Sequence, residues 1–298
     1  MNFNHLFIFH KVAEKRHFTR AAEELFISQP AVSKQIHELE KTLGQPLFTH
    51  MGRSIYLTEA GQLLYDYASR IFALSSEAEA ALDEMHDLKR GRLVIGASTT
   101  IGTYLLPELL GRYQTHYPHI QLSLDITNAN EVQERLLAHR IEIGLVEGMV
   151  SDTELVKQVW QQDELVLIAS PQYPSVRNNE QISLQHLIDE NIPFIRREQG
   201  SGTREVLEEA IAVRGLRPLQ TSMELGSTEA IKRAVAAGLG VSFVSAHTIE
   251  LELAAGLLRR VPITDFKLTR PLSIVFSRQR RLSRAAQVFL QLIQDGKT

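Results

Sequence analysis

Four polar side chains that can bond bases or phosphates lie at helical spacing near the N-terminus: Gln29, Ser33, Lys34 and His37. Glutamine can bond adenine through two hydrogen bonds, and lysine can reach a guanine or a phosphate. The apolar residues of the same segment recur at spacings of four, three and four, as on one buried helix face: Val32, Ile36, Leu39 and Leu43. The segment therefore predicts an amphipathic helix whose polar face could read a DNA major groove.

The neighbouring elements must hold that helix against the duplex. Thr19 is expected to cap a short helix that runs through Leu25, and Ser28 to cap the second helix, with Pro30 in its first turn. Gly44 is expected to end the second helix, and a hairpin and the start of a long helix follow. Residues 18–61 thus predict a winged helix-turn-helix. The alternative is an ordinary amphipathic helix with a solvated polar face.

The stretch AAEELFISQPAVSKQIHELEKTLGQPLF, followed by a hairpin and LTEAG, resembles the LysR-type transcriptional regulator family from Phe3 to about Gly61. The resemblance implies a non-enzymatic regulator that binds duplex DNA. His37 and His50 stand where the family commonly carries arginine, and Arg53 is the remaining wing arginine, so DNA affinity is expected to rise as the pH falls. The expected DNA contacts are Thr19, Ser28, Gln29, Pro30, Ser33, Lys34, His37, His50 and Arg53.

Composition excludes several classes of function. The chain has 298 residues, net charge −3 and no cysteine, so disulfide scaffolds and thiolate metal sites are excluded. No cofactor or metal motif is present, and neither a membrane span nor a signal peptide is recognisable, so a cytoplasmic protein is expected. A hydrolase built on Ser201 and an exported solute-binding protein remain as distant alternatives.

Residues 59–90 predict one long helix that joins two copies of the chain. Apolar residues recur alternately at spacings of four and three, which is a heptad seam: Ala60, Leu64, Tyr67, Ile71, Leu74, Ala78, Ala81, Met85 and Leu88. The alternative is a helix packed on its own domain. The family resemblance favours a dimer through this linker helix, extended to a tetramer, on a palindromic operator, with RNA polymerase as a further candidate partner.

From residue 92 onward apolar strands alternate with helical patterns, which predicts parallel sheets covered by helices. We expect an α/β effector domain of two subdomains, similar to periplasmic solute-binding proteins. Residues 91–161 and 267–298 form the first, and residues 162–266 the second. The DNA-binding domain is expected to cover residues 1–58. A ligand would lie between the subdomains, at strand ends and helix N-termini.

Three loops that follow strands and open helices offer hydroxyls and free backbone N–H groups to such a ligand. The pattern fits a small anion, an oxyanion or a carboxylate, and Arg204 could neutralise it. The expected effector contacts are Ser98, Thr99, Thr100, Gly200, Ser201, Gly202, Thr203, Arg204, Ser227 and Thr228. Ordinary helix capping uses the same residue types, so a vestigial pocket stays an alternative.

The roles of Glu147 and Glu224 stay open. ASTTIGTYLLP and REQGSGTR resemble the family branch that includes regulators of sulfur assimilation and carbon fixation.

Overall fold

The computed structural model describes residues 2–51, 54–84, 91–150, 152–173 and 182–295. Its backbone contacts group into two compact units, one dominated by residues 1–82 and the other by residues 83–137 and 141–298. None of the described helices is long and apolar enough to cross a membrane.

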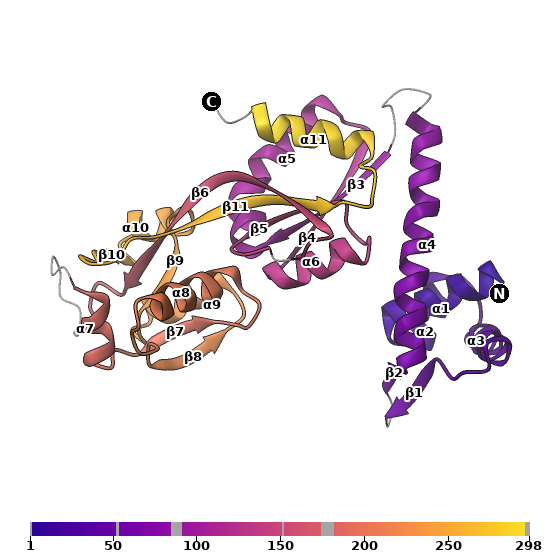
Figure 1. The fold of residues 1–298 in the computed structure, drawn as a ribbon, viewed down its shortest axis with the longest axis horizontal. Helices are drawn as coiled ribbons and strands as arrows, with labels where there is room; N and C mark the ends of the chain where they lie inside the picture. The colour runs from indigo at the N-terminus through magenta and orange to yellow at the C-terminus, as the bar shows by residue number, and fades with distance from the viewer. Residues whose placement is uncertain (1, 52–53, 85–90, 151, 174–181, 296–298) are drawn as a thin grey trace. The chain divides into compact units, whose positions relative to one another are not determined.

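The N-terminal unit is a three-helix core with a hairpin and a long helix (Figure 1). Its elements are α1 (Phe3–Lys15), α2 (Phe18–Glu24), α3 (Gln29–Leu43), β1 (Phe48–Met51), β2 (Ser54–Leu57) and α4 (Glu59–Glu84). The strands β1 and β2 pair antiparallel as the wing. Apolar residues from all three short helices, the hairpin and α4 share one core. The winged helix-turn-helix expected from the sequence is therefore confirmed.

Local capping agrees with the sequence at α3 and differs at α2. Ser28 caps α3, and Gly44 ends it with a left-handed φ of 68°. The expectation that Thr19 caps α2 was wrong: α2 begins at Phe18 and His17 is its N-cap residue, because the backbone turns from extended to helical there. The buried stripe of α3 is also one residue shorter than expected, since Leu43 is exposed.

The long helix α4 packs on its own unit with one face and leaves another face free. Tyr65 and Ala68 are buried in the N-terminal core. Tyr67 and Leu74 of the predicted seam are 55% and 66% exposed. The seam positions Met85 and Leu88, and the side chain of Ala81, lie outside the described residues.

The second unit contains a sheet in which three parallel strands meet two long antiparallel strands. The parallel strands are β3 (Gly91–Ser98), β4 (Ile120–Thr127) and β5 (Ile143–Glu147), and the long strands are β6 (Leu155–Ala169) and β11 (Leu268–Ser277). The short strands β9 (Ser242–Ser245) and β10 (Arg259–Val261) pair antiparallel with β6. A separate parallel pair consists of β7 (Phe194–Arg197) and β8 (Thr221–Leu225).

Helices cover this framework on several sides. Figure 1 shows α5 and α11 together over one face of the β3–β5 strands and α6 over the other. The helices are η1 (Ile101–Leu105, a π-helix), α5 (Leu106–His116), α6 (Ala129–Leu137), α7 (Leu184–Asp189), α8 (Gly202–Val213), α9 (Thr228–Ala236), the 3-10 helix η2 (Ala246–Thr248), α10 (Glu250–Ala254) and α11 (Arg284–Asp295).

Buried apolar residues divide this unit into two subdomains. Two clusters draw on residues 93–155 and 272–293, and two others on residues 165–268. Only β6 and β11 run continuously from one set of clusters to the other, among the strands described. The expectation of parallel sheets was therefore too simple, because two strands that cross between subdomains in opposite directions must pair antiparallel.

Candidate functional site

The polar face of α3 is accessible and begins at a well-formed helix N-terminus. Ser28 Oγ accepts a hydrogen bond from the Ala31 N–H at 3.4 Å. Gln29 Nε2 donates to Ser33 Oγ at 2.9 Å, which aligns these two side chains on one face. Lys34 is 77% exposed, with its Nζ 4.0 Å from Glu38 Oε1. Because this contact is long and the side chain is exposed, the ammonium group can also reach a phosphate or a base edge.

The structure describes some of the other expected DNA contacts and not others. Thr19 and His37 are exposed, and Pro30 lies in the first turn of α3. Arg53 and the side chain of His50 lie outside the described residues.

A charged cluster joins the helices α1 and α2. Glu24 accepts from Lys11 Nζ at 2.8 Å and from Lys15 Nζ at 2.5 Å. These two bonds lower the pKa of Glu24 from 4.5 to about 2. On α1, burial lowers the pKa of His10, whose ring stacks on Tyr65 of α4.

In the second unit a fully buried arginine bridges the two subdomains. Arg270 lies on β11, and its Nε donates to Asp163 Oδ2 of β6 at 2.8 Å. Its Nη1 donates to Thr203 Oγ1 at 2.7 Å, and its Nη2 to Thr100 Oγ1 at 3.4 Å. Thr203 opens α8 in the second subdomain, and Thr100 precedes η1 in the first. The guanidinium of Arg270 therefore joins two of the three predicted effector loops, the loop of residues 98–100 and the loop of residues 200–204.

Each of those two loops also carries a buried serine without a hydrogen-bond partner. Ser98 and Ser201 are both 1% exposed, and neither Oγ is satisfied. Each serine stands two residues before the threonine that contacts Arg270. Ser201 is the N-cap residue of α8, yet its side chain makes no capping bond. Helix capping thus does not explain either serine, and a buried unsatisfied hydroxyl is a position where a ligand can bind.

Glu147 adds an acidic group to the same region. It ends β5 with 2% exposure, and its Oε1 lies 3.6 Å from Arg270 Nη1. Its Oε2 is buried and has no hydrogen-bond partner. An ideal Cβ on Gly202 would meet the Glu147 carbonyl oxygen at 2.2 Å, so only glycine allows this approach of α8 to β5.

In the third loop, which carries Ser227 and Thr228, both side chains already have hydrogen-bond partners within the protein. Ser227 Oγ accepts from the Ala230 N–H and so caps α9. Thr228 Oγ1 accepts from Arg197 Nη1 at 3.1 Å, and Thr99 Oγ1 donates to the Thr127 carbonyl at 3.4 Å. In the second loop, Gly200 has a left-handed φ of 84° and its carbonyl accepts from the Asn130 N–H.

Arg204 pairs with two carboxylates. Its Nε donates to Glu208 at 2.9 Å and its Nη1 to Glu224 at 3.1 Å. Glu224 therefore pairs with Arg204 and, at 2.9 Å, with Arg196. The cation beside the hydroxyl-bearing loops is Arg270, which sequence reasoning missed. A charged residue inside the apolar strand LTRPLSIVFS was the available signal.

Family models match nearly the whole chain. Residues 3–62 match the bacterial regulatory helix-turn-helix protein, lysR family, and residues 86–297 match the LysR substrate binding domain. The HTH-type transcriptional activator CmpR of Synechocystis is 37% identical over 96% of this chain and 92% of its own length. The RuBisCO operon transcriptional regulator of Allochromatium vinosum is 36% identical over 96% and 93%. The resemblance to carbon-fixation regulators is confirmed.

Two solved structures show the same fold. The Synechocystis CcmR regulatory domain in complex with 2-PG (2-phosphoglycolate) covers 70% of this chain and 99% of its own, with 31% identity and a TM-score of 0.64. Full-length CbnR in complex with its target DNA covers 99% of both chains, with 23% identity and a TM-score of 0.70.

Proposed function

Because this chain belongs to the LysR family of bacterial transcriptional regulators, we propose that α3 inserts into the major groove of a palindromic operator and that two copies bind together. Gln29, Ser33 and Lys34 would contact bases and phosphates. A DNA-bound regulator acts where the chromosome lies, which is the cytoplasm, and RNA polymerase is the partner through which it would act.

The DNA contacts can be tested by measuring operator affinity against salt concentration. Lys34→Ala should weaken binding and lower the salt slope by about one, because one phosphate contact is lost. Lys41→Ala removes an exposed lysine at the far end of the same helix and should leave both quantities unchanged. Equal effects of the two variants would refute the assignment of the reading face.

The dimer would form through the exposed apolar residues of α4. Tyr67 and Leu74 lie one heptad apart and are more than half exposed. Leu74→Glu should give monomers in sedimentation, whereas Ser75→Glu, on the adjacent exposed position, should leave the dimer intact. A tetramer would need further contacts in the effector unit.

We also propose the domain limits expected from the sequence. These are a DNA-binding domain at residues 1–58, a linker helix at 59–90, a first effector subdomain at 91–161 and 267–298, and a second at 162–266.

The effector would bind among the buried hydroxyls of Ser98 and Ser201, beside Arg270. The observation that carries this proposal is that both serine Oγ atoms are buried without a partner. Two hydroxyl donors and a guanidinium favour an anion. The relative CcmR binds 2-PG, a small anion, in the same kind of domain.

The buried carboxylate of Glu147 narrows the class of anion. Its unpaired Oε2 would repel an acceptor-only ion such as sulfate, but would accept a hydrogen bond from a ligand that carries a proton. We therefore expect a hydrogen phosphate, a phosphate monoester or a hydroxycarboxylate. A site built to receive a hydrogen bond rejects analogues without the donor strongly, by roughly 10⁴-fold in favourable cases.

Thermal shift of the full-length protein tests this directly. Phosphate and glycolate should raise the melting temperature, and sulfate should not. Ser201→Ala and Ser98→Ala should each remove the shift, whereas Ser222→Ala, at an exposed site on β8, should retain it. A shift with sulfate as large as with phosphate would refute the role of Glu147. No shift with any anion would favour a vestigial pocket.

The mechanism is a shift between subdomain arrangements. A ligand bound by residues of both subdomains favours the arrangement in which they approach, and this bias would pass to the DNA-bound arms.

A further inference from the structure

A cavity lies within the second subdomain, lined by residues between Phe194 and Phe243. It has a volume of about 400 Å³ and lies between α8 and the strands β7, β8 and β9. Its wall is mainly apolar, with side chains from both aromatic and aliphatic residues: Phe194, Leu207, Ile211, Leu216, Leu219 and Phe243. Pockets of this size and lining accept small organic molecules.

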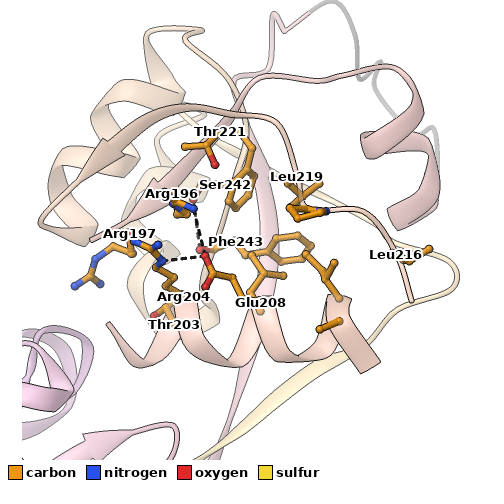
Figure 2. A pocket seen from close by; sticks show the side chains of 15 residues that line it. Arg196, Arg197, Thr203, Arg204, Glu208, Leu216, Leu219, Thr221, Ser242 and Phe243 are labelled. Atoms are coloured by element: carbon orange, nitrogen blue, oxygen red, sulfur yellow. Dashed lines mark hydrogen bonds and ion pairs between the residues drawn. The ribbon is translucent and has the colours of Figure 1, made fainter. Parts of the chain in front are cut away.

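One end of the cavity is charged. Arg196 Nη1 lies 3.4 Å from Glu208 Oε1, and Arg204 Nε lies 2.9 Å from the same oxygen. Figure 2 shows both arginines directed toward this carboxylate, with Phe243, Leu216 and Leu219 farther along the cavity. Glu224 also contacts both arginines, at 2.9 and 3.1 Å. Two cations thus converge where the apolar wall begins.

Arg196 keeps an unused hydrogen-bond donor, and the carboxylate that it contacts is exposed to solvent. The Nε of Arg196 is buried and has no hydrogen-bond partner. Glu208, by contrast, is 50% exposed on the surface of α8, so its carboxylate can turn into water at little cost. An incoming carboxylate could therefore take its place between the arginines and also accept from Arg196 Nε.

We propose that this cavity is a second ligand site that binds an arylalkyl monocarboxylate, with the carboxylate between Arg196 and Arg204 and the ring against Phe243. The apolar body distinguishes this ligand from the small anion expected among the serines. A neutral aromatic molecule would fill the cavity but would leave Arg196 Nε unpaired, so it binds more weakly.

Binding here would act on the first site through α8. The cavity wall includes Thr203, Arg204 and Leu207, while the N-cap residue of the same helix is Ser201. Thr203 contacts the cavity and also accepts from Arg270. A ligand that displaces Glu208 from Arg204 would therefore change the contacts of α8, the helix that also carries Ser201 and Thr203.

The probe is 3-phenylpropionate, and its binding to the full-length protein is measured by isothermal titration calorimetry. We expect saturable binding at one site per chain. Ala212→Phe places a ring on an exposed residue that lines the cavity, and should abolish binding. Val213→Phe adds the same ring to the next residue of α8, which is 79% exposed and outside the lining, and should leave affinity unchanged.

Two further comparisons test the chemistry and the location. 3-Phenylpropanol and the Arg196→Gln variant should each weaken binding roughly tenfold, as expected for loss of a charge-assisted hydrogen bond. Ser201→Ala should not weaken it. Absence of saturable binding, equal losses in the two α8 variants, equal affinity for the alcohol, or a loss in Ser201→Ala would each overturn the proposal. None of these readouts depends on whether an anion binds among the serines.

Discussion

The buried ion pair between Arg270 and Asp163 makes a quantitative prediction about the effector unit. At 2.8 Å the gross attraction of the two charges is about 6 kcal/mol for an effective dielectric constant of about 20. Both side chains are fully buried, so desolvation costs of several kcal/mol per ion offset most of this attraction. The intact pair therefore contributes little net stability.

Removal of one partner has a much larger effect. Arg270→Met leaves the buried Asp163 carboxyl group without its guanidinium partner; Ser245 Oγ still donates to it at 2.7 Å, and His247 Nε2 lies 4.0 Å away. We expect the free energy of unfolding to fall by about 3–5 kcal/mol. Adding Asp163→Asn removes the stranded charge and should restore about 1–3 kcal/mol of that loss.

The measurement is urea unfolding followed by the fluorescence of Trp160, the chain's single tryptophan. Trp160 lies on β6 and packs against the core of the first subdomain, so its signal reports on the effector unit alone. A loss below about 1 kcal/mol for Arg270→Met, or a double variant less stable than the single one, would refute the reasoning.

Two pH effects are expected in the DNA-binding unit. The folded pKa of Glu24, about 2, lies below its usual 4.5, so its stabilisation is complete above about pH 5 and is lost as the pH falls toward 2. Because the side chain is 37% exposed, the loss should not exceed about 1 kcal/mol. Hydrogen exchange of the α2 amides should show this, with a flatter pH dependence for Glu24→Gln; parallel curves would contradict it. The sequence-based expectation that operator affinity rises between about pH 8 and pH 6 is tested by His37→Gln, which removes an exposed imidazole from α3 and should reduce that rise; a rise unchanged by the substitution would exclude His37 as its source.

Features set by local sequence were the most predictable ones. Ser28 and Gly44 bound α3 as expected, because a capping hydroxyl and a left-handed glycine act within one turn of the chain. The predicted cap Thr19 lies two residues after the actual N-cap His17, because the backbone of His17 is extended and that of Phe18 is already helical. Periodicity also placed Leu43 in the core, but the helix ends there and its side chain stays exposed.

Long-range contacts were beyond sequence reasoning. The loops carrying Ser98 and Ser201 were predictable from strand ends followed by small residues. Arg270 bonds Thr100, 170 residues away, and Thr203, 67 residues away, and no local pattern indicates such pairings. Arg204 was the more obvious cation in the sequence, but its guanidinium donates hydrogen bonds to Glu208 and Glu224.

The contact between Gly202 and Glu147 has a consequence for which variants the protein tolerates. A single methyl group at position 202 would overlap the Glu147 carbonyl oxygen, and backbone atoms cannot swing aside as a long side chain can. Gly202→Ala would act as a wedge between α8 and β5. Substitutions there should yield regulators that fold and occupy their operators but no longer respond to an effector, a genetic phenotype separate from simple loss of function.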